Sequence, residues 1–256
     1  MKIVRFKSEN HFSFGVAISG QVKQLVGSPY KRLIYSGNVF AENEIKLLAP
    51  CKPSKIVAIG LNYRLHADEL ECNLPSHPLM FLKPPSSVIG HEEEIIHPAI
   101  SQQVDFEGEL GIVIGRKGHL VPVDEAGQYI FGYTCFNDIT ARDLQKIDGQ
   151  WTRAKSFDTF ACIGPWIETE LSPVALKIET FLNGELKQCG NTADMIFSPI
   201  ELVSAVSQVM TLEPGDVIAS GTPAGIGPME IGDVVDVKIE GVGTLRNRVS
   251  ARHLFS

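Results

Sequence analysis

Three carboxylates alternate along one segment of the chain. Asp105, Glu107 and Glu109 are separated by single residues and lead into an apolar run at 110–114. Residues two apart share a face of a β-strand, so this spacing predicts three carboxylates on one face. Such groups repel one another unless a cation neutralises them, and hard oxygen ligands favour Mg²⁺, Mn²⁺ or Ca²⁺ over zinc. The alternative is an acidic strand face exposed to solvent.

A histidine and a carboxylate lie three residues apart within 62–70, a segment that is predicted to form a short helix. His66 and Glu69 would then share one face of the helix, where the carboxylate can orient the imidazole and raise its basicity. This pairing is typical of a general base with an orienting partner. A chance pair on a surface helix is the alternative.

Two further segments carry polar groups that could face a substrate. Asp138 follows an aromatic strand, and Arg142 and Gln145 stand on what would be the next helical turn. Asp138 adds a carboxylate, although it could instead cap that helix. Lys155 is a cation inside an aromatic, turn-rich segment, where it could bind a carboxylate or an enolate. An ordinary surface lysine is the alternative for Lys155.

A glycine-rich loop follows an apolar strand at 220–227. Its backbone N–H groups, including that of Gly221, and the hydroxyl of Thr222 could bind an anion. The loop lacks the Gly-Lys-Ser/Thr ending of a nucleotide-binding loop, so a small carboxylate suits it better than a triphosphate. A tight turn without a ligand is the alternative.

The hydrophobic pattern predicts many short strands and few helices. In the first 50 residues, strands are expected at 2–6, 14–19 and 21–27, with a loop at 36–38. Later strands are expected at 55–60, 78–82, 110–115, 129–134, 217–219, 234–239 and 243–245, and the clearest helix at 198–210. Since no βαβ rhythm repeats, a mostly antiparallel or mixed β fold is predicted over a doubly wound sheet. A small N-terminal β domain at 1–50 and a main domain at 51–256 are expected.

The composition limits the classes of partner. The 256 residues carry a net charge of −7, which argues against nucleic acid and against an anionic membrane surface as partners. The five cysteines are scattered without a C-x-x-C pair, which is typical of reduced thiols. The N-terminus reads as a strand and no apolar stretch reaches the length of a membrane span. A cytoplasmic location is therefore expected.

Taken in order, the motifs from about residue 55 to 248 resemble the fumarylacetoacetate hydrolase family. The segments that carry this resemblance are 60–63 with His66 and Glu69, 81–84, 105–109, 132–134 with 137–138, 140–145, 155–160, 164–166 and 220–223. Many motifs in one order are jointly specific. The resemblance implies a mixed α/β but mostly β fold, a β-sandwich roll with a small N-terminal β appendage, and a homodimer.

By motif position, the resemblance also implies the roles of single residues. It makes Glu107, Glu109 and Asp138 the ligands of Mg²⁺ or Mn²⁺, with Ca²⁺ as a substitute, and it makes His66 with Glu69 the pair that activates water. Around the substrate it places Lys155, Arg142, Gln145 and the loop with Gly221 and Thr222. Two departures stand out. The long hydrolases of the family carry an additional aspartate ligand before the catalytic histidine, and the nearest residue here is Asn62, at a different spacing, so a short acylpyruvate-type branch is favoured. Cys162 replaces a usual proline, which bears on loop shape and not on chemistry.

A divalent cation would polarise the keto group of a 2-oxo acid and stabilise an enolate at the adjacent carbon. The predicted function is metal-dependent hydrolysis of a carbon–carbon bond in an acylpyruvate or a related 1,3-diketo acid through such an enolate. Isomerisation or decarboxylation of a 2-hydroxy-diene dioate, or decarboxylation of oxaloacetate, would use the same residues. A catalytically silent metal- or carboxylate-binding protein is less compatible with the sequence, because binding alone does not require the base at His66.

Overall fold

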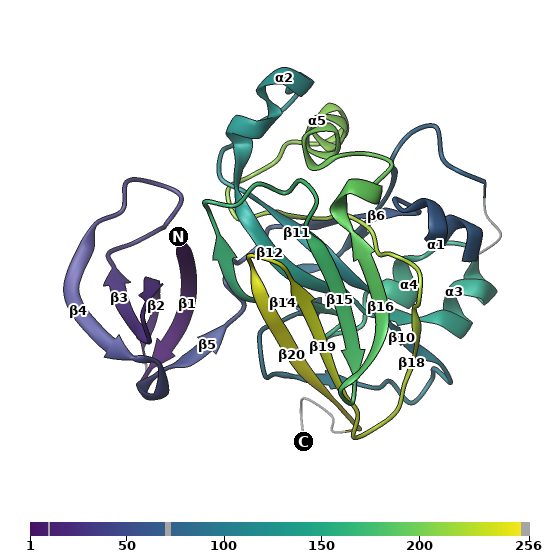
Figure 1. The fold of residues 1–256 in the computed structure, drawn as a ribbon, viewed down its shortest axis with the longest axis horizontal. Helices are drawn as coiled ribbons and strands as arrows, with labels where there is room; N and C mark the ends of the chain where they lie inside the picture. Colours follow the sequence, from purple (N-terminus) through teal and green to yellow (C-terminus); the bar gives the residue numbers. More distant parts are fainter. Residues whose placement is uncertain (10, 70–72, 252–256) are drawn as a thin grey trace.

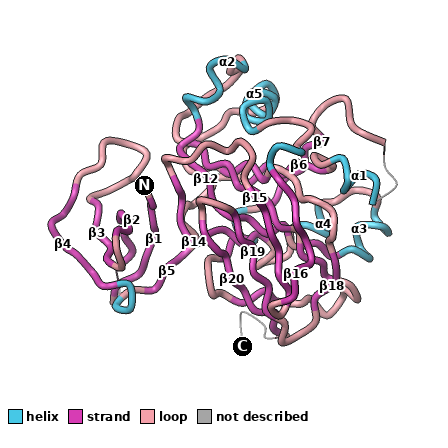
Figure 2. Tube along the Cα trace, in the orientation of Figure 1, coloured by secondary structure: helices cyan, strands magenta, loops and turns pink. Residues whose placement is uncertain are grey.

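The computed structural model describes residues 1–9, 11–69 and 73–251 of the chain (Figure 1). Strands dominate, and they form three sheets. Figure 2 shows the few helices at the periphery and along one side of the strands. Within the described ranges, no helix combines the length and the apolar character needed to cross a membrane.

The largest sheet has twelve strands in the order β4-β3-β2-β1-β14-β12-β11-β17-β6-β7, with β5 paired to β1 and β8 paired to β14. Its strands are β1 (Lys2–Ser8), β2 (His11–Ile18), β3 (Gln21–Leu25), β4 (Tyr35–Ala41), β5 (Lys46–Leu48), β6 (Ile56–Gly60), β7 (Leu79–Lys83), β8 (Val88–Ile89), β11 (Gly108–Ile114), β12 (Ile130–Asp138), β14 (Ala161–Glu168) and β17 (Val217–Ala219). Most pairs are antiparallel, but β17 with β6 and β14 with β8 are parallel, as expected for a mixed β fold.

Two smaller sheets and five α-helices complete the part of the fold that the structure describes. The three-stranded sheet contains β10 (Val104–Phe106), β13 (Thr140–Ala141) and β18 (Gly227–Met229), and the five-stranded sheet contains β9 (Glu94–Ile96), β15 (Lys177–Leu182), β16 (Glu185–Asn191), β19 (Val234–Ile239) and β20 (Gly243–Ser250). The α-helices are α1 (Arg64–Glu69), α2 (Val123–Ala126), α3 (Arg142–Asp148), α4 (Thr152–Lys155) and α5 (Pro199–Val209). Short 3₁₀ turns are η1 (Glu42–Glu44), η2 (Pro85–Ser87), η3 (Gly127–Tyr129) and η4 (Thr192–Asp194).

The core lies on both faces of the central strands. All residues of β11 are buried, which explains why its sequence is continuously apolar after Glu109 and does not alternate. Leu110 and Ile112 pack into a cluster shared with the five-stranded sheet, whereas Val113 packs into a cluster on the opposite face. This double burial fixes β11, and with it the carboxylates at its start.

Helix α5 has the features that predict a helix from sequence. Ser198 accepts a hydrogen bond from the backbone of Glu201, and the Glu201 carboxylate accepts one in return from the backbone of Ser198, which forms a capping box. Leu202, Val203 and Val206 are buried at helical spacing. The helix predicted at 198–210 is confirmed.

The loop predicted at residues 36–38 is wrong. These residues belong to the edge strand β4, which pairs with β3 through a register shift between Lys23 and Leu25. Gly37 has a φ of +94°, and the Ser36 hydroxyl and the Asn38 amide both donate to Oε1 of Gln24, at 2.9 and 2.8 Å. Turn-forming residues here build a bulge and not a turn, because the neighbouring strand supplies hydrogen-bond partners.

Strands β1 to β5 gather at one end of the molecule, beside β14 (Figure 1). The connection is short, since β1 pairs with β14 only at Lys2 with Glu168 and at Ile3 with Ile167. The N-terminal strands therefore extend the large sheet past its central part. The boundary at residue 50 stays a prediction.

Candidate active site

Three buried carboxylates converge where β11 begins and β12 ends. Glu107, Glu109 and Asp138 each offer an oxygen, and these oxygens lie within 4.8 Å of one another. Glu107 stands between β10 and β11, Glu109 on β11, and Asp138 at the end of β12. The backbone N–H of Asp138 donates to the carbonyl of Glu107 at 2.9 Å, so strand pairing sets the separation of two of these carboxylates.

Asp105 lies outside this cluster of three carboxylates, although it contacts the same guanidinium as Glu107. The strand is interrupted at Glu107, whose backbone N–H donates to the side chain of Asn137 at 2.9 Å instead of continuing a ladder. Asp105 belongs to the separate β10, where it pairs with Thr140. The single continuous strand on which the shared face was predicted is therefore not formed, and Asp105 contacts Arg142, which also contacts Glu107.

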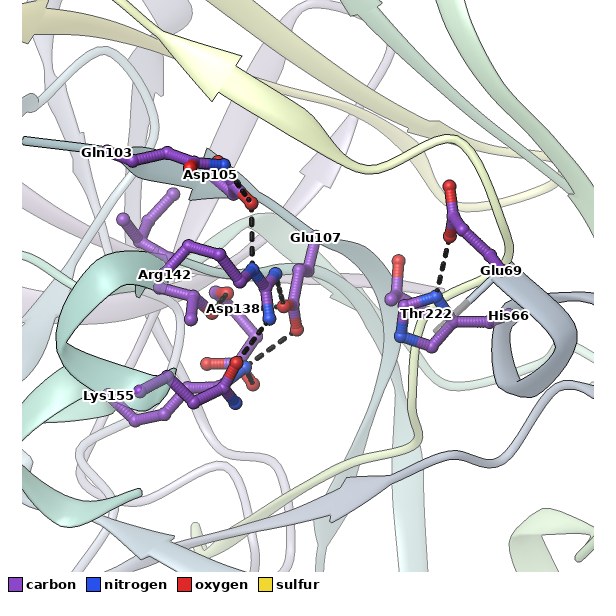
Figure 3. A network of polar contacts seen from close by, with 12 residues as sticks. His66, Glu69, Gln103, Asp105, Glu107, Asp138, Arg142, Lys155 and Thr222 are labelled. Atoms are coloured by element: carbon purple, nitrogen blue, oxygen red, sulfur yellow. Dashed lines mark hydrogen bonds and ion pairs between the residues drawn. The ribbon is translucent and has the colours of Figure 1, made fainter. Parts of the chain in front are cut away.

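Three cationic side chains surround the carboxylates. Lys155 donates to Glu107 and to Asp138, each at 2.7 Å. Lys83 forms an ion pair with Asp138 and is fully buried. Arg142 bonds to Glu107 as well, and Figure 3 shows it reaching toward Asp105 on one side and Glu107 on the other. Asp138 thus ends a strand and does not cap α3, whose cap is Ala141.

Glu109 differs from the other two carboxylates. It accepts the backbone N–H of Gly221 at 2.9 Å, but no described cation forms an ion pair with it. Burial, followed by the nearby charges of Asp138 and Glu107, raises the pKa of Glu109 well above its usual range. Burial also opposes the charged form of Glu107, but Lys155 and Arg142 outweigh it and hold that pKa low. A divalent cation fits this donor set, because it would supply the positive charge that Glu109 lacks.

The histidine and its carboxylate form the expected pair on α1. Nδ1 of His66 lies 2.9 Å from Oε2 of Glu69, and the other oxygen of Glu69 accepts the backbone N–H of Gly225 at 3.0 Å. Helix α1 is thereby attached to the glycine-rich loop. His66 is buried and lines the same cavity as Glu107 and Glu109, and Figure 3 shows the pair apart from the carboxylate cluster.

The glycine-rich loop at 220–227 is hydrogen-bonded to the start of β11, the strand that carries Glu109. The Thr222 hydroxyl donates to the carbonyl of Gly108 at 2.9 Å and accepts from the amide of Gln188 at 2.8 Å, while the N–H of Gly221 is bound to Glu109. Thr222 also lines the cavity. Its role as a cradle for a substrate carboxylate stays a prediction, as does that of Gly221.

The cavity has a volume of about 290 Å³. The predicted residues that line it are His66, Glu107, Glu109, Asp138, Arg142, Gln145, Lys155 and Thr222. Gln145 accepts from Arg142 at 2.6 Å. Sequence reasoning missed the apolar part of the wall, which is formed by Ile59, Leu61, Phe81 and Trp151. It also assigned no role to Lys83, although a lysine at the end of an apolar strand was a visible signal.

Comparison with known proteins identifies the family. Residues 55–250 match the model described as Fumarylacetoacetate (FAA) hydrolase C-terminal, and residues 1–50 match one described as Rv2993c-like, N-terminal. The chain belongs to the fumarylacetoacetate hydrolase family. It is an enzyme of that family, and the predicted family and fold are confirmed.

Relatives within the fumarylacetoacetate hydrolase family bear several names. Protein Rv2993c of Mycobacterium tuberculosis is 43% identical over 260 residues, covering 97% of this chain and 98% of that protein. The oxaloacetate tautomerase YisK of Bacillus subtilis is 45% identical over 226 residues, covering 82% and 75%. A solved structure named 5-carboxymethyl-2-hydroxymuconate delta-isomerase, from Mycobacterium smegmatis, matches with a TM-score of 0.93 at 40% identity, covering 98% of this chain and 99% of that one.

Proposed function

We propose that the protein catalyses keto–enol tautomerisation or isomerisation of a 2-oxo acid, with a divalent metal ion. The observation that carries this proposal is the cluster of Glu107, Glu109 and Asp138, which brings three oxygen ligands within 4.8 Å in a buried cavity. These three residues would hold Mg²⁺ or Mn²⁺. When bound, the metal ion supplies a Lewis acid that polarises a keto group.

The chain's own residues contribute charge and proton transfer. The ammonium of Lys155 has three donors, of which two are bound to Glu107 and Asp138. Its positive charge stands beside the site where negative charge would develop on the substrate oxygen, and this stabilises the enolate. His66, oriented by Glu69, is the group placed to accept a proton from the adjacent carbon.

The names of relatives favour tautomerisation or isomerisation as the first candidate. One relative is named an oxaloacetate tautomerase and one matching structure a delta-isomerase. Burial of the site supports such chemistry, because a low dielectric strengthens the interaction between Lys155 and a developing charge.

Hydrolysis of an acylpyruvate is the second candidate. The specific observation that favours it is the 2.9 Å contact between His66 and Glu69 at the wall of the cavity. An oriented imidazole could deprotonate a water molecule for attack on the distal carbonyl, with the enolate of a 2-oxo acid as the leaving group. Decarboxylation of oxaloacetate would need the enolate-stabilising groups alone.

A substrate panel tests the proposal. Oxaloacetate, 2-hydroxy-diene dioates and acylpyruvates would each be assayed with Mg²⁺ and with Mn²⁺, with proton exchange at the carbon next to the keto group followed by NMR. We expect metal-stimulated exchange or tautomerisation to exceed hydrolysis. Faster hydrolysis than exchange would favour the second candidate, and no metal-stimulated reaction with any of these acids would contradict both.

A further inference from the structure

One face of helix α3 borders the cavity. Arg142, Gln145 and Lys146 all line it, and their spacing of three and four residues places them on the same side of the helix. Arg142 and Gln145 are the inner members of this face, since they bond to each other at 2.6 Å and Arg142 reaches the buried Glu107. Lys146 is exposed to solvent, so it stands at the mouth.

The cations that line the cavity differ in what they bind. Arg142 is bound to Asp105 and Glu107, and Lys155 is bound to Glu107 and Asp138. Within the part of the chain that the structure describes, Lys146 forms no ion pair with any carboxylate, although it lines the same cavity. Its charge is therefore available to an anionic group at the entrance, in a protein whose net charge is −7.

Part of the cavity wall is aromatic. Trp151 packs edge-on against Phe81 with ring centroids 5.1 Å apart, and both line the cavity. The Trp151 ring lies so close to Gly60 that an added Cβ there would stand 2.6 Å from it. These rings form an apolar surface, so an anionic group held at the mouth would be recognised by Lys146 and not by this wall.

We infer that Lys146 binds the distal carboxylate of a 2-oxo dicarboxylate substrate and so distinguishes it from a monocarboxylate of the same length. This inference rests on the proposed function for the position of the 2-oxo group, which would lie at the carboxylate cluster. A second carboxylate at the other end of a short substrate molecule would then bind Lys146. Lys146 is a specificity-determining residue in this assignment, because a monocarboxylate of the same length would leave it without a partner.

A binding experiment with two matched acids tests the inference. 2-Oxoglutarate and 2-oxopentanoate have the same chain length, but the first ends in a carboxylate and the second in a methyl group. Dissociation constants would be measured by titration calorimetry on the Mn²⁺-loaded protein. Lys146→Gln removes the charge, Lys146→Arg retains it, and Lys31→Gln removes an equal charge from an exposed loop in the N-terminal region.

We expect Lys146→Gln to weaken 2-oxoglutarate binding by about two- to fivefold, the size of a solvent-exposed ion pair, and to leave 2-oxopentanoate binding within about 1.5-fold. Lys146→Arg and Lys31→Gln should bind both acids as the native protein does. Equal weakening of both acids in Lys146→Gln, or of neither, overturns the assignment. Proton exchange in the same samples is read separately by NMR, and its absence would contradict the proposed function while the ratio of dissociation constants still decides the role of Lys146.

Discussion

Nε of Arg142 donates a hydrogen bond to Oδ2 of Asp105 at 2.8 Å, so the first carboxylate of the acidic segment faces a guanidinium. The amide of Gln103 also donates to Asp105, at 3.0 Å. Asp105 thus holds one edge of Arg142 while another nitrogen of the same guanidinium contacts Glu107. Because the guanidinium is planar, fixing one edge fixes the direction of the other.

We predict that Asp105→Asn lowers kcat/KM by about 10- to 100-fold, since it removes the charge that orients Arg142. The affinity for Mn²⁺ should stay within about threefold of the native value, because Glu107, Glu109 and Asp138 remain. Steady-state kinetics and titration with Mn²⁺ followed by electron paramagnetic resonance would check both points. If Asp105→Asn bound Mn²⁺ as poorly as Glu109→Gln, Asp105 would belong to the metal site after all.

Metal removal should abolish activity reversibly. Chelation followed by addition of Mg²⁺ or Mn²⁺ is expected to restore turnover, and a metal concentration 100 times the dissociation constant should raise the free energy of unfolding by about 2.7 kcal/mol. Differential scanning calorimetry measures the second effect without any substrate. Glu109→Gln should lose both responses, and a metal-induced stabilisation that persists in this variant would show that Glu109 is not a ligand.

The sequence predicted local features better than long-range ones. The helix at α5 followed from its capping box and apolar spacing, which act within a few residues. The single strand expected over Asp105, Glu107 and Glu109 is interrupted at Glu107, because the backbone N–H there is bound to Asn137, thirty positions away in the chain. Lys83 was missed for a related reason. Local pattern shows that its strand is apolar, but only the register of distant strands reveals that its amine meets Asp138.

The family resemblance supplied what periodicity could not. It grouped Glu107, Glu109 and Asp138 before any sheet pairing was known, and the structure places these three together. It assigned no role to Trp151 or to Phe81, although Phe81 lies in one of its motifs, because an apolar wall carries no distinctive chemistry in sequence. Residues that contact by packing alone are found only once the fold brings them together.

Asp216 is predicted to stabilise the fold. Its buried carboxylate accepts from the backbone N–H and hydroxyl of Ser54 at 2.9 and 2.7 Å and from the backbone N–H of Glu213 at 2.9 Å, and it forms an ion pair with Lys55. Asp216→Asn turns part of this acceptor into a donor facing Lys55, so we expect a loss of about 2–4 kcal/mol in the free energy of unfolding. Urea denaturation measures it, and Asp124→Asn on the exposed face of α2 should change stability by less than about 0.5 kcal/mol.

This contribution should depend on pH in one direction. Burial opposes the charged form of Asp216, but hydrogen bonds from Lys55, Glu213 and Ser54 outweigh it and lower its pKa below the usual value. A group with a lowered folded-state pKa stabilises the fold above its unfolded pKa of about 3.9, and the effect is lost as pH falls through the folded pKa. The difference between the native protein and Asp216→Asn should be constant from pH 6 to 8 and shrink below about pH 4. A difference that grows on acidification would contradict this assignment.

The last prediction separates the base from the groups that stabilise the enolate. His66 contacts Glu69 at 2.9 Å, and no ion pair or hydrogen bond between His66 and the Glu107, Glu109 and Asp138 cluster is found in the described structure. His66→Ala should therefore reduce hydrolysis of an acylpyruvate by about 10²- to 10⁴-fold, the usual contribution of a general base, and largely spare decarboxylation of oxaloacetate, which needs no water in its bond-breaking step. Glu107→Ala should reduce both. His119→Ala, at an exposed position, is the matched control and should leave both unchanged. An equal loss of both activities in His66→Ala, with Mn²⁺ affinity intact, would show that the histidine also shapes the enolate site.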